Sequence, residues 1–196
     1  MINISGYKIL EKIGSGGMGD VFLAEHEKLK RKVAIKSLHK SLVNDSNFRK
    51  RFANEAVTHS KLDHPNIVKL LDYKEKDNGL FLIMEYVDGI QLDNHIKNVS
   101  GPISENDLTS LFSKILSAIG YAHNHGLVHR DIKPSNIMIS KDGNIKLLDF
   151  GIAKSNDEDK GLTMTGVQIG TAAYMSPEQV GAKKLDHLSD IYSLGV

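Results

Sequence analysis

The stretch from His129 to Gly151 constrains the fold of this chain more than any other part of its sequence. It contains two apolar runs, 137–139 and 145–148, joined by Lys141-Asp142-Gly143-Asn144. An Asp-Gly pair between such runs predicts a β-hairpin, because it tolerates the positive φ angles of a tight turn. A hairpin brings its two open ends together. The polar residues at those ends, which we expect to converge, are Asp131, Lys133, Asn136 and Asp149.

These polar side chains are suited to binding a divalent cation. A carboxylate and an amide oxygen near a second carboxylate form the oxygen-rich site that Mg²⁺ prefers. Mg²⁺ keeps several waters and takes few protein ligands alongside substrate phosphates. The sequence therefore predicts a Mg²⁺ site for phosphate chemistry, with Mn²⁺ as the alternative ion.

The composition excludes several other classes of function. The net charge is +1, from 25 Lys and Arg against 24 Asp and Glu, so no strong field favours nucleic acid or an anionic membrane. The chain has no cysteine, so it has no disulfide or thiolate metal site. No apolar run approaches the ~18 residues of a membrane span. We expect no nucleic-acid partner and no membrane contact, and we interpret His123-x-His125 as a helix end rather than a metal-ligand pair.

The N-terminal part of the chain predicts three successive antiparallel strands, at 7–13, 19–25 and 32–38. The first turn, Gly14 to Val21, fits G-x-G-x-x-G-x-V, and glycines are needed where backbone N–H groups approach a phosphate. Such a turn alone is more often an ordinary hairpin. A dinucleotide-binding fold would need a helix directly after the glycines, but the residues that follow are strand-like.

A helix is expected next, capped by Asp45 or Ser46 and ending near Lys61. Its inward face should carry Glu55, because the positions on that face are Phe48, Phe52, Glu55, His59 and Leu62, at spacings of 4, 3, 4 and 3. A carboxylate facing the interior without a partner would cost several kcal/mol, so we expect a cation to meet Glu55.

Two further strands, 67–73 and 80–86, complete a five-stranded antiparallel sheet, and a turn at 77–79 joins them. A short helix should follow at 92–99. Ser104-x-x-Asp107 resembles a capping box that opens a longer helix to about His123. The apolar positions expected to form one continuous face of this helix are Leu108, Leu111, Phe112, Ile115, Leu116, Ile119 and Ala122.

Five motifs in this order resemble those of protein kinases. The chain contains the glycine-rich turn, Val33-Ala34-Ile35-Lys36, the catalytic loop HRDIKPSN and the metal-binding DFG, followed by 170–178, which resembles the end of an activation segment. The start of helix αF is recognised at 189–195. The wording of IGSGGMGDVFLA and GTAAYMSPEQ is most similar to that of bacterial eukaryotic-type serine/threonine kinases. Two positions depart from the family pattern: Ser176 replaces an alanine, and His59 replaces an apolar residue.

The resemblance implies an α+β, bilobal protein-kinase-like fold. The N-lobe and hinge would span 1–87, with a five-stranded antiparallel sheet and helix αC. The C-lobe would span 88–196, mostly helical and incomplete, because kinases continue past helix αF. The two lobes together make one catalytic domain.

The resemblance also implies roles for individual residues. Asp131 would orient and deprotonate a substrate hydroxyl, Lys133 would neutralise charge on the γ-phosphate, and Asn136 with Asp149 would hold the metal. Lys36, which could otherwise be a surface lysine, would hold the α- and β-phosphates and pair with Glu55. The residues expected to bind ATP are Ile13, Gly14, Gly16, Gly19, Val21, Ala34, Lys36, Glu55, Met84, Glu85, Val87, Met138 and Asp149.

The expected activity is transfer of the γ-phosphate of ATP to Ser and Thr hydroxyls of proteins, the reaction of a non-specific serine/threonine protein kinase. Lys133, two residues after Asp131, favours Ser/Thr over Tyr. Autophosphorylation is expected at Thr163 or Thr165, with Arg130 as the phosphate partner. Thr171 is expected to hydrogen-bond Asp131 and Lys133, and Asp190 to bind the backbone of the catalytic loop.

Two alternatives stay open at the level of sequence: a truncated, inactive nucleotide-binding fragment or scaffold, and, less favoured, a small-molecule phosphotransferase. The chain stops at Val196, so we expect no later residue to meet Glu178 and apolar faces near helix αF to be exposed. Weak nucleotide binding, self-association and reduced phosphate transfer would follow. The expected location is the cytoplasm, with the cytoplasmic domain of a longer membrane-anchored kinase as the alternative.

Overall fold

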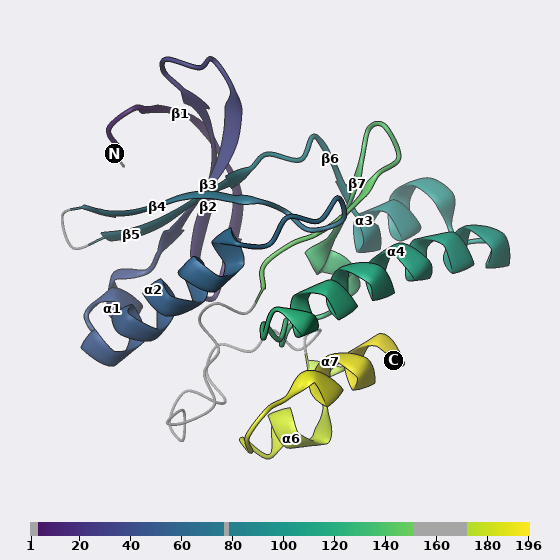
Figure 1. The fold of residues 1–196 in the computed structure, drawn as a ribbon. Coiled ribbons are helices and arrows are strands. Elements are labelled where there is room, and N and C mark those ends of the chain that lie inside the picture. The colour runs from purple at the N-terminus through teal and green to yellow at the C-terminus, as the bar shows by residue number, and fades with distance from the viewer. Residues whose placement is uncertain (1–3, 77–78, 151–171) are drawn as a thin grey trace. The chain divides into compact units, whose positions relative to one another are not determined.

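The computed structural model describes residues 4–76, 79–150 and 172–196, and these divide into two compact units. The first unit contains 1–61 and 69–87, and the second contains 62–68 and 88–196. Figure 1 shows the first as a sheet with its helices and the second as mostly helical. Each unit is described separately below. The expected phosphorylation sites Thr163 and Thr165, and Thr171, lie outside the described residues.

The first unit is built on one five-stranded antiparallel sheet, as the sequence predicts, and its strand order is β1-β2-β3-β5-β4. The turn predicted at 77–79 falls between β4 and β5, and residues 77 and 78 lie outside the described residues. The strands are β1 Tyr7–Gly16, β2 Gly19–His26, β3 Lys32–Leu38, β4 Leu70–Lys76 and β5 Gly79–Glu85.

One row of directly opposed residues runs across all five strands and contains Lys36. Residues directly opposite in antiparallel strands point to the same face of the sheet. This face therefore carries the lysine together with the glycine-rich turn's first glycine. In strand order the row is Gly14, Val21, Lys36, Leu82 and Tyr73.

Helix α2, Ser46–Ser60, packs on the face that carries Lys36. Asp45 caps this helix by accepting hydrogen bonds from two backbone N–H groups of its first turn. Phe52, on the buried side of the helix, contacts the ring of Tyr73 at 6.0 Å between centroids. Because Tyr73 belongs to the row of Lys36, the helix lies over that face. A short helix α1, Lys40–Val43, precedes it.

The other face of the sheet forms the hydrophobic core of the first unit. Strand alternation places Ile35, fully buried, on the face opposite to Lys36. Ile4, near the N-terminus, is buried in the same cluster. The cluster consists of Ile4, Ala24, Val33, Ile35, Phe81 and Ile83.

The second unit combines a small sheet with helices. The predicted hairpin is confirmed: β7 Ile137–Ser140 pairs with β8 Ile145–Leu147, and Gly143 has φ +79°. A third strand that the sequence did not indicate, β6 Gly89–Gln91, pairs with β7. Ile67, expected to begin β4, instead forms a bridge to Leu147 in this unit, so the strand starts later.

Helix α4, Glu105–Asn124, is the longest element of the second unit and begins with the predicted Ser104 cap. Its buried face differs from the expected one. Leu108 and Leu116 are 41% and 49% exposed, whereas Ala118 is fully buried. The small alanine lets the helix approach its neighbours closely, so the face turns toward Leu111, Ile115, Ala118, Ile119 and Ala122.

The remaining helices of the second unit are short. The helix expected at 92–99 is α3 Leu92–His95 followed by a π-turn, η1 Ile96–Ser100. A 3-10 turn, η2 Pro134–Asn136, leads into β7. Helices α6 Pro177–Val180 and α7 His187–Leu194 end the chain, and α7 covers the expected start of αF.

Candidate active site

Three of the predicted catalytic residues converge in the loop before β7. The Lys133 ammonium lies 3.2 Å from Asp131 Oδ2. Asn136 Nδ2 donates hydrogen bonds to the same carboxylate oxygen at 2.9 Å and to the Asp131 carbonyl at 2.7 Å. Both side chains of the ion pair are 18% exposed, which leaves the carboxylate accessible but rigidly oriented.

The loop is suited to binding a cation at the end of the hairpin. Asn136 donates both of its bonds to Asp131 through Nδ2, so these bonds do not involve its acceptor atom, Oδ1. The Leu148 N–H donates to the Asn136 carbonyl at 2.8 Å, which brings the next residue, Asp149, to the same end. Asp149 has φ +46°, a conformation that turns its side chain out of the strand direction. An amide oxygen and a carboxylate are suitable ligands for Mg²⁺.

His129 is completely buried behind the loop and links it to the strand that precedes Asp149. Its Nε2 donates to the Leu148 carbonyl at 2.7 Å, and its Nδ1 accepts from the Asp131 N–H at 3.2 Å. These two bonds require the neutral tautomer with the proton on Nε2. Burial lowers the pKa of His129, which favours the same neutral form. Its ring also packs against Phe150 at 4.7 Å.

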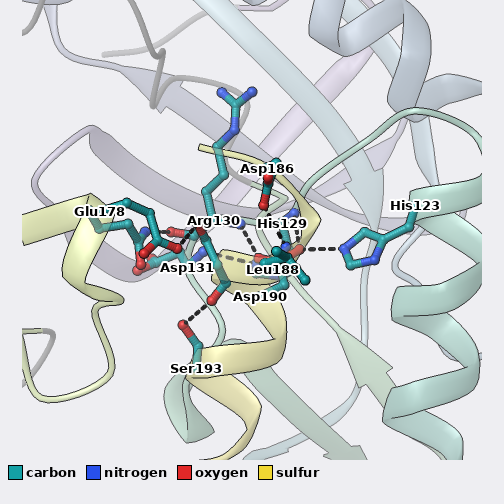
Figure 2. A network of polar contacts seen from close by, with 11 residues as sticks. His123, His129, Arg130, Asp131, Glu178, Asp186, Leu188, Asp190 and Ser193 are labelled. Carbon is teal, nitrogen blue, oxygen red and sulfur yellow. Dashed lines mark hydrogen bonds and ion pairs between the residues drawn. The ribbon is translucent and has the colours of Figure 1, made fainter. Parts of the chain in front are cut away.

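Asp190 of α7 holds the backbone of the loop, as the sequence predicts (Figure 2). Its carboxyl group, fully buried, accepts the N–H of His129 and the N–H of Arg130, each at 2.7 Å. A third bond comes from His123 Nε2 of α4, also at 2.7 Å. One carboxyl group therefore ties together two helices and the catalytic loop.

A second side chain binds the loop from α6. Gln179 Nε2 donates to the Arg130 carbonyl at 2.8 Å, while its Oε1 accepts the Ser176 N–H at 3.0 Å. The Ser176 hydroxyl in turn caps the Gln179 N–H, which completes a capping box. The serine that departs from the family pattern thus acts as a helix cap.

Glu178 has a later partner, contrary to our expectation. Ser189 of α7 donates its hydroxyl to Glu178 Oε1 at 2.5 Å. Hydrogen bonds from Ser189 and Ser176 lower the pKa of the Glu178 carboxyl. The expectation failed because a hydroxyl donor was already present in the sequence, 11 residues after Glu178.

The glycine-rich turn of the first unit is braced from two sides. Asp20 accepts from the Ser15 hydroxyl at 2.7 Å and pairs with Lys12 at 2.7 Å, and these contacts lower its pKa, with the Lys12 contact the larger cause. His39 follows β3 directly; its Nε2 donates to the Gly16 carbonyl at 3.1 Å, and its N–H donates to the Met18 carbonyl at 2.9 Å.

Val21, Ala34 and Met84, three of the predicted nucleotide residues of the first unit, lie on the Lys36 face of the sheet, whereas Glu85 is opposite Val33 and belongs to the other face. Val21 is opposite Lys36, and Ala34 is opposite Met84. Val21, Ala34 and Lys36 are partly exposed, whereas Met84 and Gly19 are buried. Gly19 has a different environment, since a Cβ there would lie 2.0 Å from the Ser37 carbonyl oxygen, so its lack of a side chain serves strand packing.

Sequence reasoning missed three residues that position the candidate site: His39, His123 and Gln179. Their partners lie 23, 67 and 49 residues away. Local spacing carries no signal for such contacts. His123 was interpreted only as part of a helix end, which is where it lies, but its ring also reaches Asp190.

The fold, the loop around Asp131 and the glycine-rich turn are those of a protein kinase domain. The sequence matches the protein kinase domain family over residues 7–196, and the chain belongs to this family. It is 45% identical over 194 residues to the serine/threonine-protein kinase PrkC of Bacillus subtilis, covering 98% of this chain and 30% of that protein. It is 42% identical to the serine/threonine-protein kinase PknB of Mycolicibacterium smegmatis, covering 96% of this chain and 31% of that protein.

Solved structures give the same result. The chain resembles the crystal structure of the Mycobacterium tuberculosis PknI kinase domain with a TM-score of 0.78 and 29% identity, covering 98% of this chain and 72% of that one. It therefore spans about a third of the curated relatives and most of a solved kinase domain. None of the helices in the described part of the chain has the length and apolar composition that a membrane crossing requires.

Proposed function

We propose that this chain transfers the γ-phosphate of ATP to Ser and Thr hydroxyls of proteins, including its own. The single observation that supports this most strongly is the arrangement of Asp131, Lys133 and Asn136 around one carboxylate. Membership of the protein kinase family and relatives named serine/threonine-protein kinases agree with it.

In this proposal, Asp131 accepts the proton of the substrate hydroxyl. Lys133 and Asn136 both contact Oδ2 of this carboxylate, which fixes its orientation toward the substrate hydroxyl in this proposal. Phosphoryl transfer needs little covalent help, so catalysis depends on positioning and on stabilising charge. Lys133 stays beside the carboxylate and neutralises charge on the transferring phosphate.

Asn136 Oδ1 and the Asp149 carboxylate would hold Mg²⁺, with Mn²⁺ as an alternative. When bound, the ion neutralises phosphate charge. The assignment of Asn136 follows from its amide orientation, because Nδ2 is directed to Asp131 and the acceptor atom is left for the metal.

The first unit supplies the nucleotide-binding residues of this proposal. Lys36 binds the phosphates and pairs with Glu55, which is half-buried on a helix packed over the face of Lys36. The Glu85 N–H donates to the Lys69 carbonyl at 2.9 Å. The Glu85 carbonyl, and not its N–H, is therefore the group that we assign to adenine, together with the backbone of Val87. The apolar contacts to adenine would come from Ile13, Val21, Ala34, Met84 and Met138.

The proposal is tested by transfer of labelled phosphate from ATP to a generic protein substrate. Asp131→Asn should reduce transfer by at least about a hundredfold, because the variant cannot accept the proton. Lys36→Met should reduce transfer by weakening ATP binding, and Asp149→Asn by raising the Mg²⁺ concentration needed.

The structural control for this experiment is Asp142→Asn, in the exposed turn between β7 and β8. It makes the same chemical change away from the site and should keep full transfer. Nucleotide binding without transfer in the unaltered chain would favour an inactive scaffold. Transfer to small metabolites but not to protein would favour a small-molecule phosphotransferase.

A further inference from the structure

Arg130 has an unusual backbone conformation directly before the proposed catalytic base. Its φ angle is +64°, in the left-handed region that residues with a Cβ rarely adopt. Such a conformation is strained and persists only where surrounding groups enforce it. The peptide that joins Arg130 to Asp131 therefore depends on its hydrogen-bond partners.

Two side chains hold Arg130 from opposite ends of its backbone. Asp190 accepts the Arg130 N–H at 2.7 Å, and Gln179 donates to the Arg130 carbonyl at 2.8 Å. That carbonyl belongs to the same peptide group as the Asp131 N–H, which donates to His129. Gln179 is thus the side chain that fixes the carbonyl side of the peptide carrying Asp131.

The amide of Gln179 fits this position in one orientation only. Its partner on one side is the Ser176 N–H, which can only donate, and on the other the Arg130 carbonyl, which can only accept. Oε1 must therefore face Ser176 and Nε2 must face Arg130. A side chain with only acceptors, or only donors, satisfies one partner and fails the other.

We propose that Gln179 is a positioning residue for catalysis, which sets the orientation of Asp131 through the carbonyl of Arg130 and couples that orientation to helix α6. This inference rests on the proposed kinase function. Gln179 follows Pro177 and Glu178 on α6, directly after residues 170–178, which resemble the end of an activation segment. A shift of α6 moves the Gln179 amide, and with it the peptide before Asp131.

Two substitutions at this position separate the two hydrogen bonds. Gln179→Glu keeps an acceptor for Ser176 but places a carboxylate oxygen against the Arg130 carbonyl. Gln179→Lys keeps a donor for the Arg130 carbonyl and loses the acceptor. We expect kcat of Gln179→Glu to fall about tenfold to a hundredfold with KM for ATP within twofold, because misplacement of a catalytic group by about 1 Å can cost a hundredfold. Gln179→Lys should retain most of kcat.

The matched control is Ser176→Ala, which removes the hydroxyl of the capping box and leaves the contact to Arg130. If Gln179 only stabilised α6, this variant and Gln179→Lys would lower kcat at least as much as Gln179→Glu, which keeps the acceptor for Ser176. A second measurement does not depend on turnover. Hydrogen exchange of a peptide covering 129–131 should be faster in Gln179→Glu than in the other variants.

The outcomes separate the inference from the proposed function. An unaltered chain that transfers no phosphate contradicts the proposed function, and hydrogen exchange alone then decides the role of Gln179. In an active chain, unchanged kcat and unchanged exchange in Gln179→Glu overturn the inference. An equal loss of kcat in all three variants overturns it as well, because α6 stability would explain the effect.

Discussion

Asp190 accepts three hydrogen bonds at a position with no exposure to solvent, and two of them come from the backbone N–H groups of His129 and Arg130. In Asp190→Asn one oxygen becomes an NH₂ group, which cannot accept a hydrogen bond. At least one buried N–H then loses its partner. We expect a loss of about 1–3 kcal/mol in the free energy of unfolding, measured by urea denaturation.

The control for Asp190→Asn lies on the same helix. Asp186 caps α7 by accepting the Leu188 N–H at 2.8 Å and is exposed (Figure 2). Asn caps helices as well as Asp, so Asp186→Asn should change the free energy of unfolding by less than about 0.5 kcal/mol. Equal effects of the two substitutions would mean that the buried carboxyl group has no special role.

At the residue scale, the sequence predicted contacts that a hairpin or a short loop creates. Asp131, Lys133 and Asn136 converge because they lie within six positions of one loop. Gln179 was not predicted, because its amide meets Arg130 only after α6 has packed against the loop. A glutamine after Pro177 and Glu178 looks like an ordinary residue of a helix start, and its second bond is visible only in three dimensions.

At the scale of elements, two glycines next to the β1–β2 turn are needed for different physical reasons. A Cβ on Gly19 would lie 2.0 Å from the Ser37 carbonyl oxygen, whereas a Cβ on Gly16 would meet nothing closer than 4.0 Å. Gly19→Ala should push β2 away from β3 and cost about 1–3 kcal/mol in the free energy of unfolding. Gly16→Ala should leave the folded first unit nearly unchanged.

The two glycine variants are compared by urea denaturation and by KM for ATP. Gly16→Ala should raise KM for ATP while stability stays within about 0.5 kcal/mol, because only the approach of backbone to phosphate is affected. A large loss of stability in Gly16→Ala, or none in Gly19→Ala, would contradict this division between a nucleotide-binding and a packing glycine.

The sequence indicated elements well where they are long and amphipathic, and poorly where they are short. β1, β2, β3 and α2 were predicted nearly to their bounds because their apolar periodicity extends over a full element. β6 has three residues, too few for any period, and it exists because β7 offers it an edge. Within α4 the buried face was misplaced, since Ala118 carries little hydrophobic signal but allows close packing.

On the scale of the whole molecule, the two units differ in the groups that titrate with altered pKa. Burial lowers the pKa of both His129 and His64, and both lie in the second unit. In the first unit, hydrogen bonds from Tyr73 and Arg49 lower the pKa of Glu75, which holds β4 to α2. The histidines respond to mild acid, whereas Glu75 responds only to stronger acid.

The direction of each effect follows from which state binds more protons. A histidine whose pKa in the folded state is below its ordinary value of 6.5 is protonated first in the unfolded chain. The stability that the neutral ring contributes is complete above pH 6.5, and it is lost as the pH falls through the lower pKa of the folded state. Glu75 has its pKa below the ordinary 4.5, so its contribution persists until the pH falls below that value.

We therefore expect acid to weaken the second unit before the first. Protection factors from hydrogen exchange, corrected for the intrinsic pH dependence of exchange, should fall between pH 7.5 and pH 5.5 in the second unit and stay constant in the first.

His129→Phe removes one titrating ring, so the second unit should lose less protection over the same interval, although its starting stability is lower. Below pH 4.5 the first unit should weaken as well, and Glu75→Gln should flatten that later loss. A simultaneous decrease in both units between pH 7.5 and pH 5.5 would show that the buried histidines do not control the acid response.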